Sequence, residues 1–246
     1  RANSLQTMTM QHYDLILFDL DGTLVDSVPD LTTALGLMLA ERGLPPHNEQ
    51  TVRQIIGEGQ RSLVERALLR ASPSPVGEQA IDPVLLDEAV LRFREHYSAN
   101  LCQKTRRYEG VLETLQTLSA RKPLAVATNK PGRWARALCD ELALSPMLRW
   151  VLGEDDVGAR KPDPTILLEL CRRAAVPTEK TLFVGDSRID WKAAQAAGID
   201  LALCTYGYAD EATLRTAEQL ARDPSFRFRC PERPYVLHSL VELLPI

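Results

Sequence analysis

The stretch "YDLILFDLDGTLVDS", residues 13–27, decides the fold of this chain. Its apolar run Leu15–Phe18 is typical of a buried strand. The run ends at Asp19 and Asp21, which one residue separates. Side chains two positions apart on an extended backbone emerge on the same side, so two like charges leave the same edge of the predicted sheet.

Short apolar runs alternate with helical patterns from residue 124 onward. Parallel strands need crossover connections, and helices usually supply them. We therefore predict an α/β fold, a Rossmann-like parallel sheet with helices on both faces, whose ligands bind beyond the carboxyl ends of the strands. The runs are LILF (15–18), LAVAT (124–128), RWVLG (149–153), TLFVGD (181–186) and LALCTYG (201–207).

A helical unit interrupts this pattern between residues 28 and 101. Apolar residues recur there at three- and four-residue spacing over 31–43, 49–71 and 82–101. We predict an α-helical cap at 28–101, inserted into a catalytic core formed by 12–27 and 102–246. Residues 1–11 show no periodicity and are left out of the fold prediction.

The end of the chain carries two further features. Residues 209–234 form a long connection that includes the basic and aromatic "FRFRCPERPY", whose role the sequence leaves open. The amphipathic segment "VLHSLVELL", 236–244, predicts a helix that packs on its own domain.

Composition excludes several classes of protein. The 29 Lys and Arg against 33 Asp and Glu leave a net charge of −4, which argues against nucleic acid as the main partner. No apolar run approaches the roughly 18 residues of a membrane span. The five cysteines form no C-x-x-C, which favours free thiols in a reducing compartment. We expect a cytoplasmic protein with no membrane partner, either a monomer or a homodimer.

Acidic residues cluster at two predicted strand ends. Asp19 and Asp21 follow one strand, and Asp186 and Asp190 follow another. Adjacent carboxylates repel one another unless a cation or a shared proton compensates them, and hard oxygen ligands of this number suit Mg²⁺. Such residues also cap helices or lie in solvated turns, so a single pair would prove little.

Three residues after other strands are candidates for phosphate binding. Thr128 and Asn129 precede a predicted helix, where side-chain and backbone donors can hold a phosphoryl group. Lys161 lies beside two prolines that fix its backbone as the chain enters the next helix. Taken alone, the Thr-Asn pair would be a helix cap and the lysine an ordinary surface residue.

Taken together, these motifs resemble the haloacid dehalogenase-type phosphatase superfamily. The resemblance rests on D-x-D-G-T at 19–23, the strand-end Thr128, Lys161, and G-D-x-x-x-D at 185–190, all in the family's order. It covers about residues 14–207, and the helical insertion falls at the family's first cap position. Because the dehalogenase branch lacks an acid at the position of Asp21, the resemblance favours phosphoryl transfer.

The resemblance implies a role for each site residue. Asp19 is expected to be the nucleophile that becomes an aspartyl phosphate, and Asp21 the general acid and then the base. Mg²⁺ is expected on the Asp19 carboxylate, the Asp21 backbone carbonyl and Asp186, with Asp190 in the outer shell. Thr23 is expected to hold Asp21 through its hydroxyl.

The expected substrate rests on the cap. The segment IIGEGQRSLVERAL, 55–68, resembles the corresponding part of phosphoglycolate phosphatases, so Gly57, Gly59 and Arg61 are candidates for contact with a small anionic substrate. The two glycines also fit a simple helix break, with Arg61 exposed to solvent. The resemblance leaves open another small phosphorylated metabolite, pyrophosphate, or a β-phosphoglucomutase-like phosphotransfer.

A receiver-type phosphoacceptor switch is the main alternative outside enzymes. Receivers also combine acids, Thr and Lys at strand ends, but they carry the acceptor Asp on a later strand, are about half as long and have no cap. We therefore predict a Mg²⁺-dependent phosphomonoester hydrolase that acts on 2-phosphoglycolate.

Overall fold

The computed structural model describes residues 10–72, 81–222 and 235–244. The chain divides into two compact units. The core unit comprises Arg1–Val25 and Arg107–Ile246, and the helical unit comprises Asp26–Arg106. The role of residues 28–101 as a cap stays a prediction.

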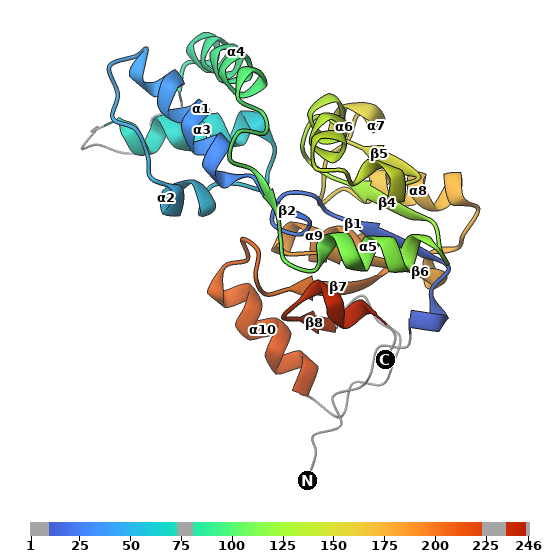
Figure 1. The fold of residues 1–246 in the computed structure, drawn as a ribbon. Helices are drawn as coiled ribbons and strands as arrows, with labels where there is room; N and C mark the ends of the chain where they lie inside the picture. The colour runs from blue at the N-terminus through green and yellow to red at the C-terminus, as the bar shows by residue number, and fades with distance from the viewer. Residues whose placement is uncertain (1–9, 73–80, 223–234, 245–246) are drawn as a thin grey trace. The chain divides into compact units, whose positions relative to one another are not determined.

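A six-stranded sheet forms the centre of the core unit (Figure 1). Each neighbouring pair of strands is parallel, which confirms the predicted α/β class. In spatial order the strands are β5 (Trp150–Leu152), β4 (Leu124–Ala127), β1 (Leu15–Phe18), β6 (Thr181–Gly185), β7 (Asp200–Cys204) and β8 (Tyr235–Leu237).

Strand β1 lies inside the sheet, and its four residues are fully buried. Leu15 and Leu17 belong to the apolar cluster that includes residues of α8 (Thr165–Ala174) and α9 (Arg188–Ala197). Their neighbours along the strand point to the opposite face, because side chains alternate on a strand. Figure 1 shows α5 (Val111–Ser119) on one side of the strands and α9 on the other.

Two further helices follow strands of the core unit. Helix α6 (Gly132–Glu141) follows β4 and contacts β5. Helix α7 (Glu154–Val157) follows β5 and contacts both α6 and α8. Strands β4 and β5 are therefore each followed by a loop and a helix at the carboxyl end of the sheet.

The two passages between the units lie in a pair of short strands. Strand β2 (Val25–Asp26) pairs with β3 (Arg106–Arg107) in a separate two-stranded sheet. The chain thus leaves the core unit shortly after β1 and re-enters it shortly before α5.

The helical unit contains α1 (Val28–Ala40), α2 (Glu49–Arg53), α3 (Gln60–Ala71) and α4 (Pro83–Ala99). Helix α1 contacts each of the other three, and α3 also contacts α4. A single helix over 49–71, which the apolar spacing alone would give, is wrong: the chain breaks between α2 and α3, at the two glycines that the sequence offered as a helix break. Gly59 has φ +84° at the N-cap of α3, a conformation that side chains disfavour and that ends helical geometry there.

The predicted C-terminal helix over 236–244 is also wrong. Residues Tyr235–Leu237 form β8, which extends the sheet beside β7, and Leu240–Leu243 form a single 3-10 turn. The short apolar run at the start of this segment fits a strand as well as a helix, and pairing with the backbone of β7 decides between them. Helix α10 (Glu211–Arg222) lies within the long connection, of which residues 223–234 are outside the described part of the chain.

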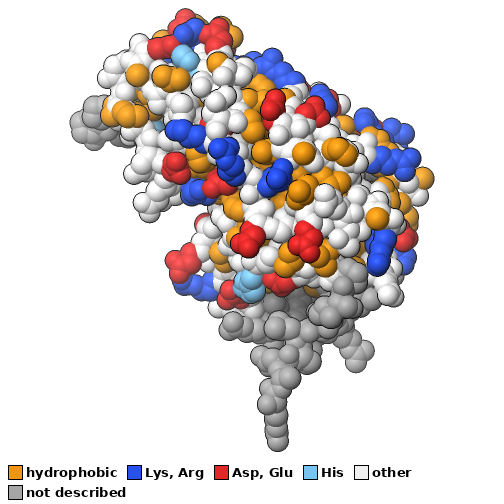
Figure 2. Space-filling model, in the orientation of Figure 1, with side chains coloured by type: hydrophobic (Ala, Val, Ile, Leu, Met, Phe, Trp, Pro, Cys, Tyr) orange, Lys and Arg blue, Asp and Glu red, His pale blue; other side chains and the backbone are white. Residues whose placement is uncertain are grey.

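Acidic, basic and hydrophobic side chains are interspersed on the face drawn in Figure 2. That distribution agrees with a chain whose opposite charges nearly balance, at −4 overall. Among the described residues, no helix has the length and apolar character that a membrane span requires.

A buried carboxylate ties the two ends of the helical unit together. Asp30, in the first turn of α1, is 1% exposed. It accepts hydrogen bonds from the backbone of Lys104 at 3.0 Å and from the backbone and hydroxyl of Thr105 at 2.8 and 2.7 Å. Because charged acceptors form strong hydrogen bonds, Asp30 anchors the returning chain against α1.

Replacing Asp30 should therefore destabilise the helical unit. In Asp30→Ala, buried donors lose their acceptor, and we expect a loss of about 3 kcal/mol in the free energy of unfolding, measured by urea denaturation. Thr105→Val removes one of those bonds and should cost only about 1 kcal/mol. Equal losses in the two variants would contradict the anchoring role.

Candidate active site

Asp19 directly follows β1, at the carboxyl end of the strand. Its backbone amide donates to the Val184 carbonyl of β6 at 2.8 Å, which continues the parallel ladder by one residue past β1. Its side chain is only 12% exposed. Lys161 Nζ lies 2.8 Å from Asp19 Oδ1, so the predicted nucleophile and the predicted phosphate-binding lysine are in direct contact.

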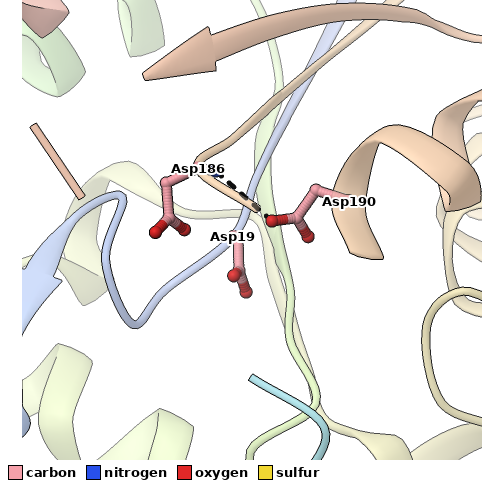
Figure 3. A group of neighbouring side chains, drawn as sticks. All are labelled: Asp19, Asp186 and Asp190. Carbon is pink, nitrogen blue, oxygen red and sulfur yellow. Dashed lines mark hydrogen bonds between the residues drawn. The ribbon is translucent and has the colours of Figure 1, made fainter. Parts of the chain in front are cut away.

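Three carboxylates gather around this point. Asp19, Asp186 and Asp190 each offer an oxygen, and these oxygens lie within 4.8 Å of one another. Figure 3 shows Asp186 in the loop after β6 and Asp190 at the start of α9, with a hydrogen bond between them. Residues 167 positions apart therefore meet at one sheet edge, because β1 and β6 are neighbours.

Asp190 also has a structural function. It occupies the third position of α9, where its carboxylate accepts hydrogen bonds from the Ser187 hydroxyl at 2.6 Å and the Ser187 amide at 3.0 Å, in a capping box. Its other oxygen accepts from Lys161 Nζ at 2.6 Å. Protein groups thus engage both oxygens of Asp190, an arrangement that suits the outer-shell position predicted for it.

Asp186 is held by groups from two loops. The Thr23 hydroxyl donates to Asp186 Oδ1 at 3.2 Å, and the Tyr208 amide donates to Oδ2. The sequence-based assignment of the Thr23 hydroxyl to Asp21 is therefore wrong. The turn after β1 directs that hydroxyl toward the neighbouring strand end instead.

Gly22 permits the close approach of Asp186 to the turn. Its φ is +88°, and a Cβ atom at this position would lie 2.2 Å from Asp186 Oδ2. Both the backbone conformation and the space therefore require glycine. The D-x-D-G-T motif thus contributes to the site through the absence of a side chain at Gly22 as well as through its two acids.

The side chains of Thr128 and Asn129, both predicted to bind phosphate, differ in how the protein already engages them. The side-chain amide of Asn129 donates to the backbone carbonyl of Lys161 at 2.9 Å, and the backbone amide of Lys161 donates to Asn129 Oδ1 at 2.7 Å. This reciprocal pair fixes the backbone of Lys161. The Thr128 hydroxyl oxygen accepts from the Lys130 amide at 3.2 Å, a bond that does not use the hydroxyl hydrogen.

Sequence reasoning missed Lys130. Its side chain is 5% exposed, and Nζ lies 3.1 and 3.0 Å from the two carboxylate oxygens of Asp21. The available signal was its place directly after Thr128 and Asn129 at a strand end. A lysine there is ordinarily exposed, and only the packing of β4 beside β1 reveals its partner.

The formal charge of the site indicates the kind of ion that it can bind. Four carboxylates and two ammonium groups leave a formal charge of −2 when all six are ionised. The donors are hard oxygen atoms in a buried position, which is the chemistry that Mg²⁺ prefers. The residues therefore fit a divalent cation held by Asp19 and Asp186.

The electrostatics of the protein alone oppose full ionisation. Burial raises the pKa of Asp19 to about 7, with Lys161 opposing the shift and Asp190 adding to it. Burial, together with Asp190 and Asp19, raises the pKa of Asp186 well above its usual range. Burial alone would lower the pKa of Lys161, but Asp19 and Asp190 raise it above its usual value. A bound cation would favour the ionised carboxylates.

The candidate cap residues lie in the helical unit. Gly57 has φ +116° and, with Gly59, lies in the break between α2 and α3. The Arg61 guanidinium forms an ion pair with Asp87, and both side chains are exposed. This ion pair links α3 to α4 and is a structural reason for Arg61. Substrate contact by the three residues stays a prediction.

Comparison with known proteins identifies the family. The sequence pattern of haloacid dehalogenase-like hydrolases matches residues 16–204. Phosphoglycolate phosphatase 1 of Pseudomonas aeruginosa is 45% identical over 196 residues, which are 79% of this chain and 70% of that protein. The phosphoglycolate phosphatase of Pseudomonas putida is 41% identical over 195 residues, with the same coverage.

A solved structure has the same fold. The crystal structure of a predicted phosphoglycolate phosphatase from Haemophilus somnus superposes with a TM-score of 0.80 at 31% identity, covering 95% of this chain and 97% of that one. The fold and the buried acid–lysine cluster define an enzyme of phosphoryl transfer. The chain belongs to the haloacid dehalogenase-like hydrolase family, and it is a phosphatase. The predicted family and enzyme class are confirmed, and the receiver-type switch is not supported.

The raised pKa of Asp19 predicts how stability responds to pH and Mg²⁺. Without a cation, the folded state binds protons more tightly than the unfolded chain, so stability falls as pH rises toward about 7. Protons and Mg²⁺ compete for the same oxygens. We therefore expect Mg²⁺ to raise the melting temperature more at about pH 8 than at about pH 6, measured by differential scanning fluorimetry.

Asp186→Asn provides the control, because it removes one carboxylate from the cluster. It should reduce the Mg²⁺-induced shift at both pH values. An equal shift at the two pH values in the unaltered protein would contradict competition between protons and the cation.

Proposed function

We propose that this phosphatase is a Mg²⁺-dependent phosphomonoesterase that forms an aspartyl phosphate on Asp19 and acts on 2-phosphoglycolate. The observation that carries the proposal is the contact of Asp19 with Lys161 inside the carboxylate cluster. The two Pseudomonas relatives are phosphoglycolate phosphatases, which supports the choice of substrate.

In the first step, an oxygen of the Asp19 carboxylate attacks phosphorus. A bond forms between that oxygen and phosphorus, and the bond between phosphorus and the ester oxygen breaks. Asp21 donates a proton to the departing alkoxide, which leaves as glycolate. Because attack joins two anions, Lys161 stabilises the charge on the phosphoryl oxygens that it faces.

In the second step, water hydrolyses the aspartyl phosphate. Asp21, now ionised, takes a proton from the water molecule as it attacks phosphorus. The bond between phosphorus and Asp19 breaks, inorganic phosphate leaves, and both aspartates return to their starting states. Asp21 thus needs to stay near the reacting oxygen in both steps.

The remaining residues position these groups. The Thr128 hydroxyl donates its hydrogen to a phosphoryl oxygen, while Asn129 keeps the Lys161 backbone in place. Asp19, Asp186 and the Asp21 backbone carbonyl would hold Mg²⁺, with Asp190 outside them. The bound cation would supply charge neutralisation for the phosphoryl group.

Further parts of the proposal rest on the resemblance. Gly57, Gly59 and Arg61 are proposed to select the substrate. The protein is proposed to act in the cytoplasm, as the free thiols of the four cysteines in the described ranges suggest. Another small phosphorylated metabolite, pyrophosphate, or transfer to a sugar phosphate is the alternative reaction.

Asp19→Asn should abolish turnover. The amide cannot attack phosphorus, so release of phosphate should fall at least about 10³-fold while the melting temperature changes little. Phosphate release in the presence of Mg²⁺ measures the effect. Asp14→Asn, an exposed aspartate before the same strand, is the matched control and should keep full activity. Retained turnover in Asp19→Asn would exclude Asp19 as the nucleophile.

The substrate assignment predicts a ranking. Among phosphorylated metabolites compared by kcat/KM, 2-phosphoglycolate should be the best substrate, ahead of sugar phosphates and pyrophosphate. If it falls in the middle of that ranking, the substrate is another one, although the phosphatase assignment remains. Product analysis separates hydrolysis from transfer, because only hydrolysis releases inorganic phosphate.

A further inference from the structure

Each acid of the D-x-D motif has a buried lysine of its own. Lys161 lies 2.8 Å from Asp19, and Lys130 lies 3.0 Å from Asp21. The two lysines come from different connections, Lys130 from the one between β4 and α6 and Lys161 from the one between α7 and α8. The reaction as proposed assigns no purpose to the contact between Lys130 and Asp21.

The backbone of Lys130 is held on several sides. Its amide donates to Thr128 Oγ1, and the Gly132 amide donates to Asp155 Oδ1 at 2.7 Å. The backbone carbonyl of Lys130 lies against Gly153, where an added Cβ would come within 2.4 Å of that carbonyl oxygen. With its backbone constrained and its side chain 5% exposed, Lys130 presents its ammonium at a defined position.

Asp21 needs such a fixed point more than Asp19 does. Its side chain is 15% exposed, and it is close enough to Asp19 to add to the rise in the pKa of that group. Like charges repel, so the Asp21 carboxylate would turn away from Asp19 in the absence of an attractive partner. Contact of one ammonium with both oxygens of Asp21 opposes that movement.

We propose that Lys130 is a positioning residue that holds the Asp21 carboxylate beside the ester oxygen of the substrate. This inference rests on the proposed function, in which Asp21 transfers a proton to the leaving group. A carboxylate that has moved by about 1 Å loses much of its effectiveness, because proton transfer needs hydrogen-bond geometry. Lys130 would thereby affect catalysis through Asp21 and without contact with the phosphoryl group.

Leaving groups of different basicity test this role. Ethyl phosphate and 2-phosphoglycolate release alkoxides that need a proton, whereas 4-nitrophenyl phosphate releases a stable phenolate that does not. The ratio kcat/KM reports steps up to departure of the leaving group, so the later hydrolysis of the aspartyl phosphate does not enter it. Comparing kcat/KM for the three substrates therefore isolates the proton transfer to the leaving group.

In Lys130→Met we expect kcat/KM for both alkyl phosphates to fall about 100-fold, while that for 4-nitrophenyl phosphate changes by less than about threefold. Asp21→Asn should show the same selectivity. In the double variant, Lys130→Met should add little to the loss caused by Asp21→Asn, because the two residues act as one unit. Lys130→Arg, which keeps a cation for the carboxylate, should restore part of the activity toward alkyl phosphates.

Two further variants complete the experiment. Lys192→Met, an exposed lysine on α9, is the control for loss of one positive charge and should leave all three kcat/KM values unchanged. Lys130→Gln keeps a hydrogen-bond donor and replaces Lys130→Met if the latter does not fold, as judged by circular dichroism. Without the charge that opposes repulsion from Asp19, it should show the same selective loss.

Other patterns would overturn the inference. An equal loss with all three substrates would mean that Lys130 binds the phosphoryl group or only stabilises the fold. A loss confined to 2-phosphoglycolate would mean that Lys130 binds the carboxylate of that substrate. Losses that multiply in the double variant would show that Lys130 acts independently of Asp21. Absence of activity toward all three substrates in the unaltered protein would instead refute the proposed function.

Discussion

The crowding of four carboxylates at one buried sheet edge is the constraint on which the rest of the site depends. Isolated buried carboxylates are costly, and neighbouring ones repel, so the burial of Asp19 and Asp186 raises the pKa of each. Two buried lysines compensate half of the formal charge. The remaining charge of −2 explains why such an edge suits a divalent cation.

Close backbone packing makes this crowding possible. Gly22 admits the Asp186 carboxylate, and Gly153 admits the loop that carries Lys130, at separations where any Cβ would collide. Asn129 joins that loop to the backbone of Lys161 through two hydrogen bonds. The site is therefore a set of loops that hold one another, and the parallel strands supply their common base.

Local backbone conformation and strand pairing decided three features of the structure. Residues 49–71 divide into α2 and α3 where Gly59 adopts a positive φ, which agrees with the helix break that the glycines indicated and which apolar periodicity alone does not register. The terminal segment became strand β8 because β7 offered an unpaired edge, a partner that lies about 30 residues away in the sequence. Thr23 turned toward Asp186 for a similar reason, since β6 brings that residue next to the turn.

The sequence by itself determined the strand-and-helix order, the acidic motifs and the family, because buried strands have a distinct composition and the motifs follow them directly. The central position of β1 and the meeting of Asp19 with Asp186 depended on strand order, which the motifs only implied. Only the tertiary structure showed that Lys130 contacts Asp21, because a lysine reveals its partner only when the two strand ends that carry them lie side by side.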